Sequence, residues 1–288
     1  MPFEDAMAAT MQWITAVDAL AALGAEASLL ASGGSATPEL KAALNAVSTA
    51  AGLTDLSELP PPQLAMLAGV IKMTLHQAVE LLDNPERGTG WTYTDPAILD
   101  GYGRGSAMIP AMLAGHPSLG GVKNFLDVGT GVGLLAIAAA NVWPDAVVTG
   151  IDPWEPSLER ARENIAQAGL GDRIVLRSQV AADMDDVDAF DCAWVPTFFL
   201  TETALQESLP PLVRAVQPGG WVVLGRNKSR PDPLAEATLA VRLVRGGGTN
   251  LDPKRAVELL EQAGLVDVQV LTPQGPGPLE FVLGQCPS

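Results

Sequence analysis

Hydrophobic residues recur along this chain with two different periods, and the change falls near residue 118. Up to that point alanine, leucine and methionine recur at helical spacing between breaks at residues 32–35, 59–62 and 84–88. This pattern predicts four or five helices and no sheet. Beyond it, short apolar runs alternate with helical patterns, which predicts an α/β fold with a mostly parallel sheet. We therefore expect an all-α domain at residues 1–118, followed by an α/β domain at residues 119–288.

The second part contains enough apolar runs for a seven-stranded sheet. The helical patterns between the first five runs predict parallel strands, whereas the last two runs are close enough to pair as a C-terminal antiparallel hairpin. In such a sheet, ligands bind at the carboxyl ends of the strands, here near the switch point between the first and fourth. The runs lie at residues 125–128, 146–151, 173–177, 190–195, 221–224, 266–271 and 279–283.

The first of these runs ends in three alternate glycines, Gly129, Gly131 and Gly133, and passes at once into an alanine-rich helical pattern. Glycine lets the backbone turn tightly and approach a ligand, and the start of the next helix presents free N–H groups at the same place. We therefore expect Gly131 to have a positive φ or to lie against a ligand. Asp152 follows the second run, where doubly wound nucleotide folds place an acid for the ribose hydroxyls.

Dinucleotide binding and S-adenosylmethionine binding share this geometry, and the glycine spacing helps to separate them. In the frame that starts where the strand ends, the sixth position is Leu134, whereas a dinucleotide fingerprint needs glycine or alanine there for close helix packing. A shifted frame at residues 131–136 fits, but it begins two residues beyond the strand. The sequence therefore favours S-adenosylmethionine and keeps an NAD(P)-dependent oxidoreductase as the alternative.

Three stretches carry a resemblance to a known family. Residues 126–133 resemble the first motif of class I S-adenosylmethionine-dependent methyltransferases, residues 150–152 resemble the second, and residues 217–224 resemble the turn into the family's fifth strand. With a helical domain in front, the chain is similar to bacterial small-molecule, or natural-product, methyltransferases. The resemblance implies a Rossmann-like core and S-adenosyl-L-methionine as the cofactor.

The same resemblance implies which residues hold this cofactor. The first motif lines the methionine part, Asp152 binds the ribose diol, and the residues after the third strand reach the adenine. Gln179 stands near the position where many relatives carry an aspartate, and its amide oxygen is able to accept the same hydrogen bond. The predicted cofactor residues are Asp127, Gly129, Thr130, Gly131, Gly133, Asp152, Pro153, Ser178, Gln179, Val180 and Val195.

Aromatic residues make up only 5% of the chain, and several fall at the domain junction or at strand ends that face the predicted cleft. Together they would wall a flat, mostly apolar substrate, with core packing as the alternative for each one. Tyr93 and Tyr102 are the candidates for catalysis, because a phenol at a cleft can orient a nucleophile. The predicted substrate-pocket residues are Trp91, Tyr93, Tyr102, Trp154, Pro196, Phe198 and Phe199.

No histidine is available for the role that one has in plant-type O-methyltransferases, which also carry a helical front domain and place a catalytic histidine shortly after the fourth strand. The only histidines are His76 and His116. His76 shares a helix face with Lys72 and Glu80, which indicates an exposed stripe, and His116 is expected to cap a helix C-terminus. We therefore predict methyl transfer to an O, N or C atom of a small organic molecule without an essential histidine. A non-catalytic S-adenosylmethionine-binding protein is a further alternative.

The helical domain has no motif of its own. The resemblance implies that it roofs the pocket or forms a homodimer, and a scaffold that only stabilises the core is the alternative.

Composition limits the partners. The chain has 33 acidic and 17 basic residues, a net charge of −16 that would repel a phosphate backbone, so we expect no nucleic-acid partner. Cys192 and Cys286 are the only cysteines, which supports neither a disulfide framework nor a metal site and fits a reducing cytoplasm. We expect no signal peptide and no membrane span. Arg226, just past the fifth strand, is expected to be exposed.

Overall fold

The computed structural model describes residues 1–273 and 277–288. The chain forms two compact units that interleave in sequence. The first unit contains Met1–Pro85 and Asp95–Gly105, and the second contains Glu86–Thr94 and Ser106–Ser288.

The first unit is helical, as the sequence predicts. Proline opens α2 and α3, where its fixed φ suits the first turn, and Gly33 ends α1 in a left-handed conformation. Gly24 of α1 lies against Ile71 of α3, since a Cβ at Gly24 would be 2.8 Å from Cγ2 of Ile71. The elements are α1 (Phe3–Ser32), α2 (Pro38–Ala50), η1 (Leu56–Glu58), α3 (Pro61–Asp83) and α4 (Pro96–Ser106).

The expectation that no segment could span a membrane is wrong on length and composition. Helices α1 and α3 are each long and apolar enough for a span. Alanine, leucine and methionine fill both helices and leave few charges in either. Core helices and signal sequences meet the same criterion, so these two helices are weak evidence for a membrane location.

The second unit is built on a seven-stranded sheet in the order β3-β2-β1-β4-β5-β7-β6. The first five strands are parallel, and β7 pairs antiparallel with both β5 and β6. This confirms the predicted Rossmann-like sheet with its C-terminal hairpin. The strands are β1 (Asn124–Val128), β2 (Val147–Asp152), β3 (Ile174–Ser178), β4 (Phe190–Pro196), β5 (Val216–Asn227), β6 (Val266–Leu271) and β7 (Leu279–Gln285).

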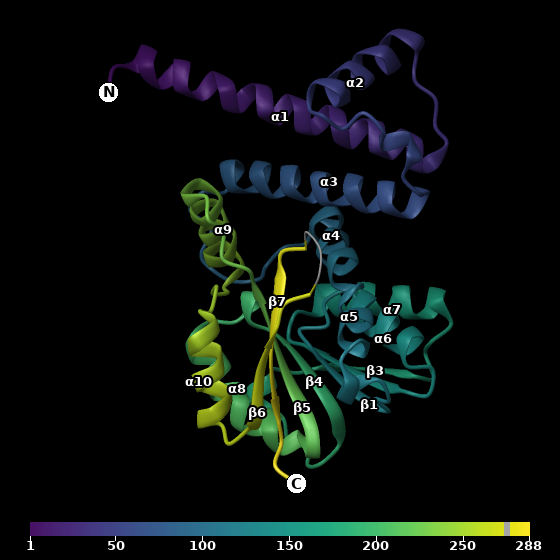
Figure 1. Cartoon of the computed structure of the whole chain (residues 1–288), viewed down its shortest axis with the longest axis vertical. Coiled ribbons are helices and arrows are strands. Elements are labelled where there is room, and N and C mark those ends of the chain that lie inside the picture. The colour runs from purple at the N-terminus through teal and green to yellow at the C-terminus, as the bar shows by residue number, and fades with distance from the viewer. Residues whose placement is uncertain (274–276) are drawn as a thin grey trace. The chain divides into compact units, whose positions relative to one another are not determined.

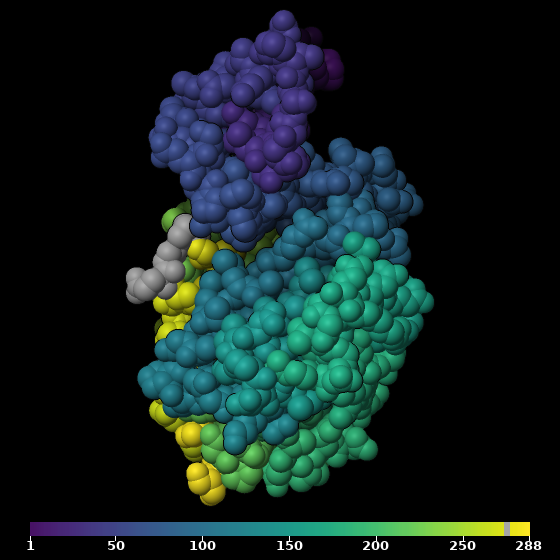
Figure 2. All heavy atoms as spheres, turned by 90° about the vertical axis from the view of Figure 1, so that its right-hand side faces the viewer, coloured from purple at the N-terminus to yellow at the C-terminus, as the bar shows by residue number. Residues whose placement is uncertain are grey.

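Helices cover both faces of this sheet (Figure 1). Helices α5, α6 and α7 lie on one side, and α8 and α10 lie on the other. Figure 2 looks onto the first side, where the teal residues cover the sheet. The helices of this unit are α5 (Ile109–Ala114), α6 (Leu134–Val142), α7 (Glu155–Ala168), α8 (Glu202–Ala215), α9 (Pro233–Gly246) and α10 (Pro253–Gln262), with short 3-10 turns η2 (Pro117–Leu119), η3 (Ala181–Asp183) and η4 (Thr197–Phe199).

The division between the units differs from the predicted boundary at residue 118. Ile109 and Leu113 of α5 are buried in the same cluster as Phe125 of β1 and Trp143. Because these side chains share a core with the sheet, the chain from Ser106 onward belongs to the second unit. Helical spacing alone does not reveal which core a helix joins.

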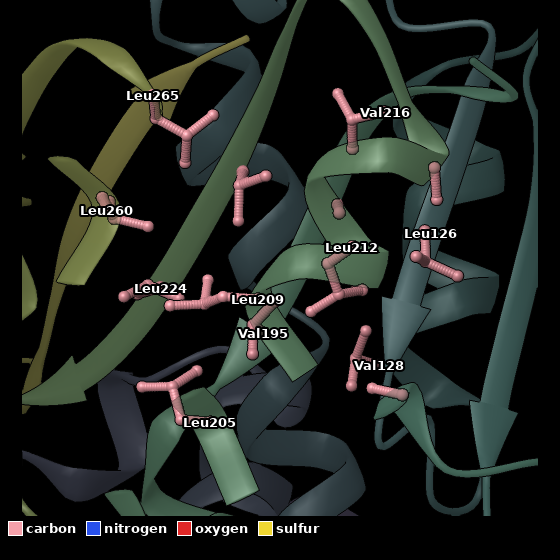
Figure 3. Packing of buried hydrophobic residues seen from close by; sticks show 14 of the residues in the cluster. Leu126, Val128, Val195, Leu205, Leu209, Leu212, Val216, Leu224, Leu260 and Leu265 are labelled. Atoms are coloured by element: carbon pink, nitrogen blue, oxygen red, sulfur yellow. The ribbon is translucent and has the colours of Figure 1, made fainter. Parts of the chain in front are cut away.

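The core on the α8 side shows why this helix lies where it does. Leu205, Leu209 and Leu212 repeat at helical spacing, and all three are at most 2% exposed. Figure 3 shows them pointing toward Val195 of β4 and Leu224 of β5. Full burial of one such side chain stabilises the fold by roughly 1.5–3 kcal/mol.

On the opposite face, Trp194 of β4 lies directly against Gly225 of β5. A Cβ at Gly225 would be 2.0 Å from Cη2 of Trp194. The indole is 2% exposed and packs edge to face on Phe281, with ring centroids 5.6 Å apart. The ring therefore has no free direction in which to move.

We expect Gly225→Ala to lower the free energy of unfolding by roughly 2–3 kcal/mol, the upper end of the range for overpacking a core. Urea denaturation followed by circular dichroism measures the change. Gly171→Ala is the matched control, because a Cβ at this exposed glycine meets nothing within 4 Å. Equal stability of the two variants would contradict the packing described here.

Candidate functional site

The glycine turn after β1 forms the floor of the candidate site. Gly129, Gly131 and Gly133 have φ values of 66°, 56° and 76°, the left-handed region that favours glycine. The N–H groups of Gly129 and Thr130 donate to the carbonyl oxygen of Ile151 at 2.8 and 3.0 Å, which ties the turn to β2. The positive φ expected at Gly131 is confirmed.

The carboxylate of Asp152 holds this turn in place. Its Oδ2 accepts the N–H of Gly131 at 2.9 Å, and its Oδ1 accepts the N–H of Trp154 at 2.8 Å, at the entrance to α7. Burial raises the pKa of Asp152, and these two N–H groups counteract part of that rise. A carboxylate oxygen can accept more than one hydrogen bond, so Asp152 retains acceptor capacity for a ligand.

A second acid lies beneath the turn. Asp127 is 1% exposed, and its Oδ2 accepts the hydroxyl of Thr130 at 2.7 Å. Burial raises the pKa of Asp127 to about 7, and the nearby charge of Asp152 adds to the rise. The glycine opposite Asp127 on β2 makes room for this pair, because a Cβ at Gly150 would be 2.7 Å from Oγ1 of Thr130.

The residues predicted to reach an adenine lie at the neighbouring edge. Ser178 ends β3 in register with Asp152. The N–H of Gln179 donates to the carbonyl oxygen of Asp152 at 3.3 Å, and its side-chain Nε2 donates to the carbonyl oxygen of Asp183 at 2.9 Å. This leaves Oε1 of Gln179 as the acceptor that the predicted role needs. Pro153 follows β2 directly at this edge, and Val180 is the second residue after β3.

Val195 differs from the other predicted cofactor residues. Its side chain is fully buried in the cluster beneath α8. Any contact with a ligand must therefore come from its backbone.

Six of the seven predicted substrate residues belong to the second unit, and aromatic contacts link four of them. The ring of Trp91 lies 5.1 Å from Tyr93 and 4.8 Å from Phe199, and Phe198 lies 4.8 Å from Phe199, between centroids. The indole N–H of Trp154 donates to the carbonyl oxygen of Tyr93 at 3.1 Å.

The other two residues have different surroundings. Pro196 lies over the glycine turn, with its Cγ 3.5 Å from the Cβ position of Gly129. Tyr102 belongs to the first unit, where Nε2 of Gln77 donates to its hydroxyl at 2.9 Å.

The interpretation of His116 is wrong, and His76 has a partner that the sequence did not reveal. Nδ1 of His76, whose side chain is 40% exposed, lies 2.6 Å from Oδ2 of Asp95, the residue before α4. His116 caps the start of η2, not the end of α5, because its Nδ1 accepts the N–H of Ser118 at 3.3 Å. In both cases the partner lies beyond the end of the preceding helix, which helical spacing does not report.

Three arginines have roles that sequence reasoning missed. Arg226 is 2% exposed rather than exposed: it forms an ion pair with Glu280 on β7 and donates to the carbonyl oxygen of Leu251 at 2.7 Å. The side chains of Arg87 and Arg245 each donate to the other's backbone carbonyl oxygen. Of these contacts, only the ion pair could have been inferred from the sequence. Residues 226 and 280 carry opposite charges, and the antiparallel pairing of β5 and β7 places them opposite each other.

The described residues offer this site neither a cluster of metal ligands nor a disulfide. Within residues 1–273 and 277–288, no group of three or more His, Cys, Asp or Glu side chains is placed to hold a metal ion. Cys192 and Cys286 are buried free thiols.

Comparison with known proteins connects this geometry to a family. Residues 125–220 match a family described as "Methyltransferase domain", which confirms the resemblance seen in the motifs. The matched region includes the glycine turn, Asp127 and Asp152.

Curated relatives share part of the chain. Ribosomal protein L11 methyltransferase of Sorangium cellulosum is 30% identical over 150 residues, 51% of this chain and 45% of that protein. The S-adenosyl-L-methionine-dependent methyl transferase PigF of a Serratia species is 29% identical over 161 residues, 53% of this chain and 46% of its own length. The chain thus matches less than half the length of either relative.

Solved structures share the fold over nearly the whole chain. Human N-acetylserotonin methyltransferase in complex with SAM has a TM-score of 0.69 and 14% identity, covering 100% of this chain and 99% of that one. PigF with SAH has a TM-score of 0.65 and 18% identity, with 99% of each chain covered. At these identities the likeness establishes the fold, including the helices that precede the sheet.

The raised pKa of Asp127 predicts a pH-dependent stability. Because folded Asp127 keeps its proton up to about pH 7, whereas an unfolded aspartate releases it near pH 3.9, ionisation opposes folding. The stabilisation that protonated Asp127 provides is therefore lost as the pH rises from about 5 to about 8, and this loss is on the order of a few kcal/mol.

Asp127→Asn removes the ionisable group and should show a correspondingly smaller loss of stability between these two pH values in urea titrations. Asp145→Asn, at an exposed position, is the control and should behave as the wild type does. The same pH dependence in Asp127→Asn and the wild type would show that Asp127 does not titrate as described.

Proposed function

Because residues 125–220 carry a methyltransferase domain, we propose that the protein transfers the methyl group of S-adenosyl-L-methionine to a small organic molecule. The observation that carries this proposal is the glycine turn, which Asp152 holds open at the carboxyl edge of the sheet. The turn and the acid come from the two motifs that distinguish this family.

The residues of the turn fit such a cofactor. A Cβ at Gly131 would meet only the carbonyl oxygen of Gly129, at 3.9 Å, so the space in front of this backbone is open to a ligand. Asp152 supplies acceptors suited to a pair of ribose hydroxyls, and Gln179 supplies one suited to the adenine amino group. Gly129 and Thr130 would flank the methionine part.

When bound, S-adenosylmethionine would supply a methyl group activated by the positive charge on sulfur. It would give up this methyl group with S-adenosylhomocysteine as the leaving group, and an acceptor that arrives protonated would need a base or a water molecule to take its proton. The chain's task is then to align the acceptor and to exclude water. Trp91, Tyr93, Phe198 and Phe199 provide an apolar wall suited to this task.

Two observations support a small substrate. The fold match to PigF and to human N-acetylserotonin methyltransferase extends over the helices in front of the sheet. The net charge of −16 disfavours a nucleic acid. Oxygen is the default acceptor in this proposal, and nitrogen or carbon acceptors are the alternatives.

We extend the proposal to assembly and location. Large apolar side chains on α1 are 44–74% exposed, which suits a homodimer through the first unit; they are Phe3, Met7, Met11, Trp13, Ile14 and Val17. The two free thiols suit a reducing cytoplasm.

Calorimetric titration tests the proposal. We expect binding of S-adenosylmethionine and of S-adenosylhomocysteine, and negligible binding of NAD. Asp152→Ala should weaken cofactor binding by roughly 2 kcal/mol, about a thirtyfold rise in Kd, because the hydrogen bonds that the ligand's hydroxyls donate to a charged group are lost.

Two further variants make this result specific. Asp172→Ala removes an exposed acid and should bind as the wild type does. Asp152→Asn, which retains one acceptor oxygen, should have a cofactor affinity between those of the wild type and Asp152→Ala. Thermal unfolding shows whether each variant is folded. Normal affinity in a folded Asp152→Ala variant would remove Asp152 from the site.

Once a substrate is known, His76→Ala and His116→Ala should each keep turnover within about tenfold of the wild type. Removal of a true general base typically costs ~10²–10⁴ in rate. A hundredfold loss of turnover in either variant, with folding and cofactor affinity intact, would show that a histidine acts in catalysis and would contradict a mechanism based on alignment alone.

A further inference from the structure

The segment Glu86–Thr94, here called the strap, belongs to the second unit although it lies between α3 and α4 in sequence. It contains no helix or strand. Three groups of contacts hold it on the second unit, at α9, at the end of β4 and at the end of β2.

The first contact is a reciprocal pairing of two arginines that lie 158 residues apart. Nη1 of Arg245, at the end of α9, donates to the carbonyl oxygen of Arg87 at 2.8 Å. Nη2 of Arg87 and the N–H of Gly90 both donate to the carbonyl oxygen of Arg245, at 3.4 and 3.3 Å. The backbones meet closely here, since a Cβ at Gly247 would be 2.8 Å from the Cα of Gly90. We call this the arginine clasp.

Arg87 also fixes the strap internally. Its Nη1 donates to the carbonyl oxygen of Gly90 at 3.0 Å and to the hydroxyl of Thr92 at 2.6 Å. Its guanidinium carbon lies 4.6 Å from the centroid of the Tyr93 ring, a cation–π distance. One side chain therefore sets both the path of the strap and the position of Tyr93, which is 5% exposed.

The remaining contacts show where the strap runs. Trp91 packs on Phe199, just past the end of β4, and the carbonyl oxygen of Tyr93 accepts the indole N–H of Trp154, just past the end of β2. Strand β1 lies between β2 and β4 in the sheet. A segment that contacts both flanking ends must pass the carboxyl end of β1, where the glycine turn lies.

We propose that the strap closes over the cofactor cleft and that Arg87, through the arginine clasp, is the positioning residue that keeps it closed. The inference rests on the proposed function, because the glycine turn beneath the strap is the proposed S-adenosylmethionine site. A closed strap excludes water from the cleft and slows the exchange of bound ligand.

The test measures release of S-adenosylhomocysteine by stopped-flow tryptophan fluorescence, since Trp91 and Trp154 lie beside the cleft. Arg87→Ala should release the ligand about tenfold faster or more, because it removes the cation–π contact and three hydrogen bonds. Arg87→Lys, which keeps the charge but not the planar fork, should release it at an intermediate rate. Arg242→Ala, which removes an exposed arginine of α9 less than one turn before Arg245, is the matched control and should match the wild type.

Hydrogen–deuterium exchange gives a second readout, one that a purely structural role would not move. In the wild type, added S-adenosylhomocysteine should slow exchange in the peptide that covers residues 86–94, and this protection should be lost in Arg87→Ala. If Arg87→Ala does not fold, Arg87→Lys is compared with the wild type instead, both in the rate of ligand release and in the protection of residues 86–94.

The outcomes separate the two proposals. A wild type that binds neither S-adenosylmethionine nor S-adenosylhomocysteine overturns the proposed function, and the role of the strap with it. A wild type that binds normally, with release equally slow in Arg87→Ala and Arg242→Ala, overturns the strap alone.

Discussion

The carboxylate of Asp152 is the contact on which the rest of the site depends. It accepts one N–H from the glycine turn and one from the entrance to α7, so a single side chain at the end of β2 sets the position of both. Without it, the left-handed turn would lose the hydrogen bond that the N–H of Gly131 donates to the end of β2. The same carboxylate is able to accept further hydrogen bonds, so the side chain that fixes the glycine turn is also suited to bind a ligand beside it.

The residues around this contact lower the cost of burying two carboxyl groups, those of Asp127 and Asp152. Asp127 lies close to Asp152, and two ionised carboxylates at such a place would repel each other. Burial and that repulsion raise the pKa of Asp127 to about 7, and the hydroxyl of Thr130 occupies one of its oxygens. Gly150 provides the space that Thr130 fills. A cationic ligand would lower the cost of ionising both acids, which links the charge of the proposed cofactor to the chemistry of its floor.

The sequence predicted the parts of this molecule whose causes are local. Alternation of apolar runs and helical patterns predicted the sheet and its hairpin, and three glycines after a strand predicted a turn with positive φ. The family resemblance, read from two short motifs, was confirmed by the family match over residues 125–220. The individual cofactor and substrate residues remain predictions, although the structure gathers most of them at one edge of the sheet.

What the sequence did not reveal depends on contacts between distant residues. Nothing in the neighbourhood of Arg87 or Arg245 indicates that they meet, because 158 residues separate them. His76 pairs with Asp95, which lies just before α4, and α5 joins the sheet's core rather than the helical unit. Each of these features is decided by packing, which a periodic pattern cannot report.

A crystal structure of the protein with S-adenosylhomocysteine tests the central claim most directly. The account predicts density for the ribose against the carboxylate of Asp152, for the amino-acid part over Gly129 and Gly131, and for the strap closed above both. Ligand density at any other edge of the sheet, or a ribose out of reach of Asp152, would contradict it.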